Sequence, residues 1–259
     1  MRSALVIVFA AACGSSPPPP AFPTPQRVVD LTHPFDDKTL YWPTSPTTFK
    51  RDSLSFGMTP AGFFYSAGAF ASPEHGGTHL DAPIHFHKDG VAADAIPVER
   101  LMGPAAVIDI SGRAAREADT LLTPDDVQGY EKKNGAIAPG TIVLVRTGWS
   151  ARWPDKKSYL GDDRPGDASR LHFPGVSQAA AALLVERKIA AVGIDTASSD
   201  HGPSKDVIAH QTLAAAQIPI FENVAALDAL PARGAFVIAL PMKIAGGSGG
   251  PLRIVAWLR

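Results

Sequence analysis

Cysteine is almost absent from this sequence, and the chain carries no strong excess of charge of either sign. A single cysteine among 259 residues excludes an intrachain disulfide in any redox compartment. The formal net charge is -1 at pH 7, which gives no electrostatic reason to expect nucleic acid as a partner. Runs of like charge are also missing, so the sequence contains no acidic or basic tail.

Apolar runs long enough to cross a membrane are missing too. The run at residues 4–12 is too short for a spanning helix, which needs about 20 residues. It follows Arg2 and fits the core of a signal peptide, which we expect to cover residues 1–12. The segment AACGSS places Cys13 as in a bacterial lipoprotein signal, and the proline-rich residues 13–27 predict a stiff tether. We therefore expect an exported bacterial protein, either periplasmic or anchored to the membrane through a lipid on Cys13.

The rest of the chain, residues 28–259, is expected to form one folded domain. The sequence is 45% hydrophobic and 19% charged, which suits a sizeable core. Apolar runs at residues 105–110 and 141–147 are typical of strands that are covered on both faces. Strand and helix patterns alternate from about residue 105 onward, which predicts an α/β fold with a mixed central sheet flanked by helices.

Other elements follow from local patterns. Residues 47–56 and 61–70 are rich in β-formers and predict a hairpin, whereas the polar residues 153–172 predict a long loop. Helices are expected at residues 97–102, from Thr123 onward, and at residues 176–188 and 204–216. Further strands are expected at residues 28–32, 190–194, 219–221, 235–240 and 252–258.

Half of the eight histidines lie between residues 75 and 87, in the segment HGGTHLDAPIHFH. A zinc-protease helix does not fit this segment, because its glycines and Pro83 disfavour a helix and no glutamate follows His75. In an extended chain, residues 75, 77, 79, 81 and 85 project to one side, and Gly77 leaves room for an ion between two imidazoles. His75, His79 and Asp81 therefore predict a site for a divalent metal such as zinc or manganese.

This segment also resembles the signature H-x-G-T-H-x-D-x-P-x-H of the metal-dependent cyclase family, which includes bacterial kynurenine formamidases and isatin hydrolases. Every fixed position of the signature is filled. His210 and Glu222 have the spacing of the family's downstream histidine and glutamate, and Trp42 resembles its pocket tryptophan. The resemblance extends over most of the chain from about Val28 to Leu258.

The resemblance implies an α/β fold and a homodimer or homotetramer. It implies that His75, His79 and Asp81 bind a first metal ion. Asp81, His210 and Glu222 would hold a second ion where two are bound. The formamidases resemble a two-zinc design, whereas the isatin hydrolases use manganese. The identity of the metal, Mn²⁺ or Zn²⁺, and the number of ions, one or two, therefore both stay open.

The implied chemistry is hydrolysis of an amide C–N bond. A divalent ion polarises the substrate carbonyl and activates water, and the resemblance implies His85 as general acid and base. Trp42 is expected to stack on an aromatic substrate. Our first hypothesis is a hydrolase of a small cyclic amide such as isatin, because the long segment at residues 153–172 resembles the isatin-type members.

Two alternatives stay open from sequence. One is an arylformamidase that hydrolyses N-formylkynurenine, although export argues against it. The other is a lipid-anchored protein that binds a metal or ligand without turnover. The segment GGSGG at residues 246–250 satisfies the serine-hydrolase pattern G-x-S-x-G, but a strand follows it and no acid or histidine remains downstream. The segment is therefore interpreted as a plain turn, with the alternative that its glycines let the backbone approach the ligand.

Overall fold

The computed structural model describes residues 26–258 of the chain, which form an α/β domain around a mixed sheet. The predicted signal peptide, the tether up to residue 25 and Cys13 lie outside the described residues. Within the described range, no helix is long and apolar enough to cross a membrane. The predicted fold class is confirmed.

The central sheet has eight strands in the order β1-β12-β11-β5-β7-β9-β10-β4. Strands β5, β7, β9 and β10 run parallel to one another. All pairings that involve β1, β4, β11 or β12 are antiparallel. The first residues of β12 also pair with β4, so β4 is held between β10 and β12. The strands are β1 (Arg27–Asp30), β4 (His79–Asp81), β5 (Met102–Asp109), β7 (Ile142–Arg146), β9 (Ala191–Ile194), β10 (Ile220–Glu222), β11 (Arg233–Pro241) and β12 (Gly249–Leu258).

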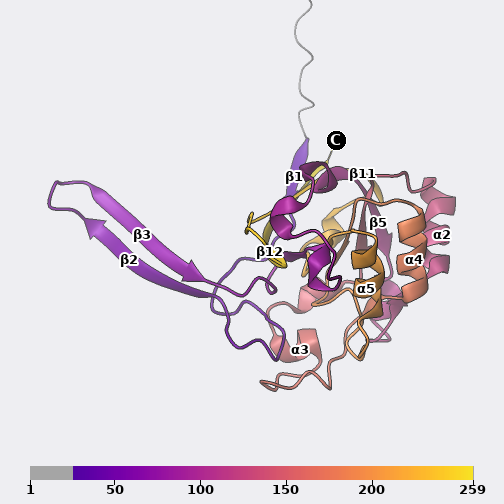
Figure 1. Ribbon diagram of the computed structural model, residues 1–259, viewed down its shortest axis with the longest axis horizontal. Coiled ribbons are helices and arrows are strands. Elements are labelled where there is room, and N and C mark those ends of the chain that lie inside the picture. The colour runs from indigo at the N-terminus through magenta and orange to yellow at the C-terminus, as the bar shows by residue number, and fades with distance from the viewer. Residues whose placement is uncertain (1–25, 259) are drawn as a thin grey trace, which may run out of the picture.

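Helices cover one side of the parallel part of the sheet (Figure 1). They are α2 (Pro124–Asn134), α4 (Gln178–Glu186) and α5 (Ile208–Ala215). Val143 and Val145 of β7 belong to the hydrophobic core between the sheet and these helices. Leu144 belongs to a separate hydrophobic core on the opposite face of the sheet. This alternation confirms that the continuous apolar run of β7 is covered on both faces.

Helix starts follow the local sequence where a side chain caps them. Thr123 and Asp126 form a reciprocal capping box at α2, and Ser177 accepts a hydrogen bond from the amide of Ala180 at α4. At α5 the prediction is wrong, because the helix begins at Ile208 rather than after Ser204. Val207 adopts a left-handed conformation with φ 46°, which delays the start of the helix.

Two further predictions need correction. The helix expected at residues 97–102 is only a 3₁₀ turn, η3 (Val98–Arg100). The loop expected at residues 153–172 contains α3 (Lys156–Leu160), whose N-terminus is capped by the carboxylate of Asp155. Tyr159 and Leu160 of α3 are fully buried against the rest of the domain, and this burial outweighs the polar composition of the segment.

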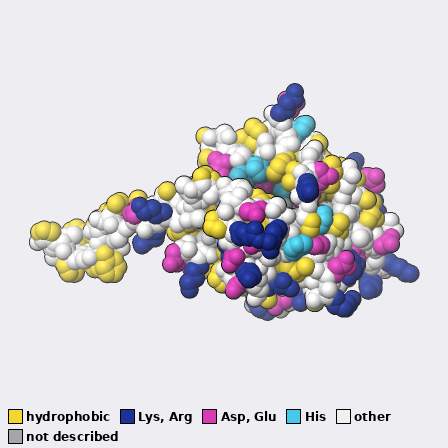
Figure 2. Space-filling view, turned by 90° about the horizontal axis from the view of Figure 1, so that it is seen from below, with side chains coloured by type: hydrophobic (Ala, Val, Ile, Leu, Met, Phe, Trp, Pro, Cys, Tyr) yellow, Lys and Arg dark blue, Asp and Glu magenta, His cyan; other side chains and the backbone are white. Residues whose placement is uncertain are grey.

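Strands β2 (Lys50–Met58) and β3 (Phe64–Ala71) form the predicted hairpin, with their ends shifted by one to three residues toward the C-terminus. Figure 1 shows this hairpin projecting from the body of the domain, and we call it the arm. Almost all of its side chains are exposed, and Figure 2 shows apolar side chains gathered at its far end. The remaining short elements are β6 (Leu121–Leu122), β8 (Gly175–Val176), α1 (Ser111–Ala114) and 3₁₀ helices at Pro83–His85 (η1), Ala93–Ala95 (η2), Trp149–Arg152 (η4) and Leu227–Ala229 (η5).

Candidate metal centre and active site

The sequence predicts one extended segment from residue 75 to residue 85, and this prediction is wrong. Only β4 is extended, and it places the side chains of His79 and Asp81 on the same face. His75 lies in a turn before β4, and His85 ends the 3₁₀ helix η1 after it. The chain therefore turns on both sides of β4 to bring these two histidines to the residues of the strand.

Gly77 does not separate the imidazoles, so that part of the prediction is wrong. Its φ is 58°, and a Cβ atom there would lie 2.6 Å from the ring of Phe35. A Cβ atom on Gly76, whose φ is 149°, would lie 2.1 Å from the ring of Tyr41. Both glycines are needed because the turn packs against aromatic rings with a backbone conformation that other residues rarely adopt.

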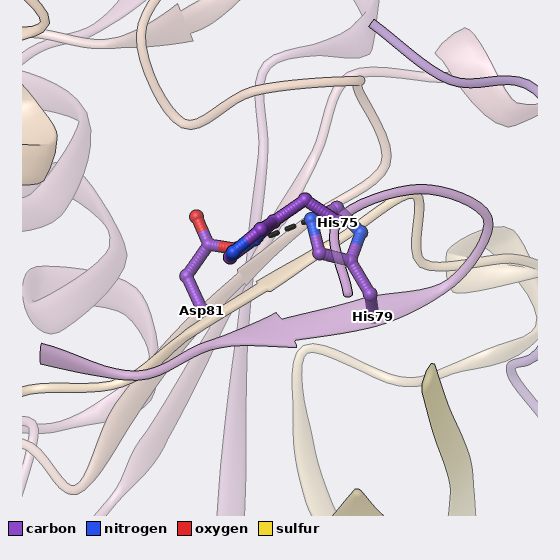
Figure 3. Close-up of side chains that lie close together, drawn as sticks. All are labelled: His75, His79 and Asp81. Carbon is purple, nitrogen blue, oxygen red and sulfur yellow. Dashed lines mark hydrogen bonds and ion pairs between the residues drawn. The ribbon is translucent and has the colours of Figure 1, made fainter. Parts of the chain in front are cut away.

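His75, His79 and Asp81 meet as the sequence predicts (Figure 3). Nδ1 of His75 lies 2.6 Å from Oδ1 of Asp81, and Nε2 of His79 lies 3.1 Å from the same oxygen. These ligand atoms are all within 4.8 Å of one another, which is close enough to share one cation. His79 and Asp81 are buried, whereas His75 is partly exposed.

Asp81, His210 and Glu222 form a second group of three that share Asp81 with the first. Nε2 of His210 lies 3.2 Å from Oδ2 of Asp81 and 2.9 Å from Oε1 of Glu222. The pairing of β4 with β10 places Glu222 opposite His79, and α5 carries His210. All five predicted ligand residues therefore converge on one place, although they come from distant parts of the chain.

Asp200 orients His210, and the sequence reasoning missed this residue. Its carboxylate accepts a hydrogen bond from Nδ1 of His210 at 2.6 Å, and it also accepts from the amides of Ala209 and His210. Nδ1 of His79 donates in the same way to the carbonyl of Gly77 at 3.0 Å. In both imidazoles this leaves Nε2 directed at the carboxylates of the cluster, as expected for metal-binding histidines. The only signal in the sequence is that Asp200 lies shortly after the carboxyl end of the buried strand β9.

The charges of this cluster are strongly coupled. Burial opposes ionisation of Asp81, but its close contacts with the imidazoles of His210, His75 and His79 outweigh burial and lower the pKa of the carboxyl well below its usual value. Burial also disfavours a proton on His210, yet the charge of Glu222 and the hydrogen bonds with Asp200 and Asp81 raise the pKa of the imidazole well above its usual value.

These opposite shifts show that the buried carboxylates demand positive charge beside them. A divalent cation fits this demand, and the imidazole nitrogens and carboxylate oxygens are donors that zinc and manganese accept. The residues present therefore fit a metal ion.

His85 lies beside the ligand cluster and belongs to neither ligand group. Its ring stacks on that of His75 with the centroids 3.7 Å apart and the planes at 16°. Burial lowers the pKa of His85 to about 4, and the nearby Asp81 only partly offsets this effect. The imidazole is therefore neutral at physiological pH and able to accept a proton.

A cavity of about 310 Å³ opens over the cluster. Its walls are mainly apolar, and its polar groups are concentrated at His75, His79, Asp81, His85, His210 and Glu222. Trp42, the predicted substrate-binding residue, lies on the wall with 40% of its surface exposed and packs edge-on against Phe173. Leu160 of α3 adds another apolar wall, so the segment at residues 153–172 contributes to the site.

Known proteins share both the sequence pattern and this fold. The cyclase family model matches residues 29–201. An isatin hydrolase of Roseibium aggregatum is 35% identical over 75% of this chain and 76% of its own length. A kynurenine formamidase of Sphingopyxis alaskensis is 28% identical over 88% of this chain and 97% of its own. The solved structure of isatin hydrolase A from Ralstonia solanacearum has a TM-score of 0.80 at 35% identity, with 90% of this chain and 92% of that chain covered.

Fold, cluster and relatives together define an enzyme of the metal-dependent hydrolase class that acts on amide C–N bonds outside peptides. The chain belongs to the cyclase family. The family resemblance inferred from the segment at residues 75–86 is thereby confirmed.

Proposed function

We propose that this enzyme opens the ring of a small aromatic cyclic amide of the isatin type. The observation that carries the proposal is the mainly apolar cavity whose lining includes aromatic rings together with the ligand cluster and His85. A flat aryl lactam can place its ring against Trp42 and Leu160 and its carbonyl toward the polar residues. The relative and the solved structure named as isatin hydrolases support this substrate class.

The chain's own residues divide the chemical work. When bound, a divalent ion polarises the substrate carbonyl and lowers the pKa of water. His75, His79 and Asp81 hold this ion, and Asp81, His210 and Glu222 hold a second ion where two are bound. His85 accepts a proton from the attacking water and returns it to the leaving nitrogen as the C–N bond breaks. The product carries a new carboxylate and a free arylamine.

Substrate comparison tests this proposal directly. We expect turnover of isatin to exceed that of N-formylkynurenine by at least tenfold in kcat/KM. The reverse ratio would make the enzyme an arylformamidase, which the similarity to a kynurenine formamidase keeps as the second candidate. Both assays use the same metal-loaded protein, so a difference in loading cannot explain the ratio.

The metal is proposed to be Mn²⁺ or Zn²⁺. Both accept the mixed nitrogen and oxygen donors of the two ligand groups, and the sharing of Asp81 supports a site that extends to two ions. Elemental analysis of the protein as isolated gives the identity and the number of ions per chain. A chain that retains neither metal after purification in metal-supplemented buffer contradicts this part of the proposal.

We further propose a homo-oligomer, with a homodimer as its basic unit. The arm exposes large apolar side chains, and 80% of Phe56 and 68% of Leu54 are accessible. A two-stranded hairpin is marginally stable without other packing, so a second copy that covers the arm would stabilise it. Sedimentation measurements distinguish a monomer, a dimer and a tetramer.

We also propose that the protein is exported and anchored through Cys13. The support is the sequence of residues 1–27 alone, with its apolar run, its cysteine and its proline-rich segment. Expression in a bacterial host should place the parent in the membrane fraction, and Cys13→Ser should move it to the periplasmic fraction. Equal amounts of both proteins in the cytoplasm would contradict export.

A further inference from the structure

The glycine-rich turn at residues 246–250 packs directly against His75. Gly249 is the first residue of β12 and pairs with Asp81 of β4. A Cβ atom on Gly249 would lie 2.6 Å from Cε1 of His75, so no larger residue fits between the turn and the imidazole. The turn that resembles a serine-hydrolase motif is therefore a close backbone contact with a predicted metal ligand.

Ser248 links this imidazole to a carboxylate. Its hydroxyl lies 2.6 Å from Oε2 of Glu74 and 2.8 Å from Nε2 of His75, and its amide also donates to Oε2 of Glu74 at 2.8 Å. A hydroxyl has one proton, and the short contact with a carboxylate takes it. The oxygen of Ser248 must then accept a hydrogen bond from Nε2 of His75.

This chain of hydrogen bonds fixes the tautomer of His75. A neutral imidazole has one N–H group, so donation from Nε2 leaves a lone pair on Nδ1. Nδ1 lies 2.6 Å from the carboxylate of Asp81, which is also an acceptor. Two acceptors that face each other at this distance need a cation, and this is the arrangement that binds a metal ion.

We infer that Glu74 and Ser248 are positioning residues that hold His75 ready to bind the metal ion through Nδ1. The inference rests on the metal site of the proposed function. It gives His75 the same kind of outer partner that Gly77 gives His79 and Asp200 gives His210. His75 needs this support more than the other two, because 26% of its side chain is exposed, against 4% for each of theirs.

Metal binding without substrate tests the inference. Co²⁺ is titrated into metal-free full-length protein, and its affinity is measured against a competing chelator while its visible spectrum is recorded. Ser248→Ala should weaken Co²⁺ binding by about tenfold or more and change the spectrum of the bound ion. Ser248→Thr keeps a hydroxyl and should bind within threefold of the parent. Glu74 and Ser248 act on His75 through the same chain of hydrogen bonds. Adding Glu74→Ala to Ser248→Ala should therefore cause little further loss of Co²⁺ affinity.

Ser177→Ala is the matched control. It removes a hydrogen-bonded serine hydroxyl from the N-terminus of α4, and Ser177 belongs to neither ligand group and does not line the cavity, so the variant should lower the melting temperature but leave the affinity and the spectrum unchanged. The inference is overturned if Ser248→Ala binds Co²⁺ like the parent, or if Ser177→Ala loses as much affinity. A parent that binds no Co²⁺ at all would instead overturn the proposed metal site, so the two failures are distinguishable.

Discussion

Strands β3 and β4 are separated by only a short turn, yet their side chains have opposite surroundings. Aromatic residues of β3 such as Phe64 and Phe70 are more than half exposed, whereas His79 and Asp81 of β4 are almost fully buried. Burying a charge is costly unless a partner compensates it, and soluble proteins rarely expose large apolar patches. The buried charges of β4 therefore call for a cation, and an apolar protein surface is the partner proposed for the arm.

The largest effect should come from removing the shared carboxylate of β4. Asp81→Asn keeps the shape of the side chain but removes the charge common to both ligand groups. Losing one partner of a buried charge cluster costs about 4 kcal/mol, which corresponds to roughly a thousandfold in metal affinity. The metal content, measured by elemental analysis, and the activity should both fall to background. An Asp81→Asn enzyme that keeps its metal would break the link between the buried charges and a cation.

His85→Asn should separate catalysis from metal binding. His85 lies outside both ligand groups, so the variant should keep its metal while kcat falls by about a hundredfold to a thousandfold. His87→Asn, two residues further along, is the control, because His87 does not line the cavity and its loss should leave kcat within twofold. An unchanged kcat in His85→Asn would remove this residue from the chemistry. If the parent shows no turnover either, a binding protein without catalysis becomes the better interpretation.

The sequence predicts the buried strands and the metal-binding segment because both depend on local patterns. Continuous apolar runs identify β5 and β7, and the spacing of His79 and Asp81 identifies one face of β4. His210 and Glu222 have no local signal of this kind, and only the family resemblance connects them to the site. Ser248 and Glu74 are still harder to find, because their contact joins residues 174 positions apart through a turn whose packing depends on glycine.

The next largest effect should be on the arm. Phe56 and Phe64 pack edge to face with their ring centroids 5.3 Å apart, and replacing both with serine removes two large exposed aromatic side chains from the arm. We expect the dimer dissociation constant to rise about a hundredfold, as for the loss of interface anchors worth about 3 kcal/mol. Analytical ultracentrifugation measures the change, and metal content per chain should stay constant.

Val98→Ser is the matched control for the arm, because Val98 is an exposed apolar residue on the body of the domain. It should leave the dissociation constant unchanged. A double arm variant that sediments like the parent would show that the exposed aromatic residues have another role.

His33 offers a smaller test, because burial shifts its pKa without the influence of the carboxylates that act on the imidazoles of the cluster. It stacks on Trp153, and burial alone lowers its pKa from 6.5 to about 4, opposite to the rise in His79. The unfolded chain therefore binds a proton more readily, so the stability associated with neutral His33 is complete above about pH 6.5 and is lost as the pH falls toward 4. Allowing for partial exposure, we expect His33→Phe to reduce the loss of unfolding free energy between pH 7 and pH 4 by about 2 kcal/mol. Parallel denaturation curves at both pH values measure it, and an equal loss in parent and variant would contradict it.

The smallest effect should come from single aromatic residues, and it distinguishes the cavity from the arm. Trp42→Ala should raise KM by about tenfold with kcat within threefold, because a stacked aromatic ring contributes about 1 kcal/mol beyond its buried area. Tyr65→Ala removes a similarly exposed ring from β3 and should leave KM unchanged at enzyme concentrations where the dimer persists. If both variants lose substrate affinity equally, the arm of one copy contributes to the cavity of another, and the two regions serve one site. If only Tyr65→Ala loses affinity, Trp42 is not the ring that holds the substrate.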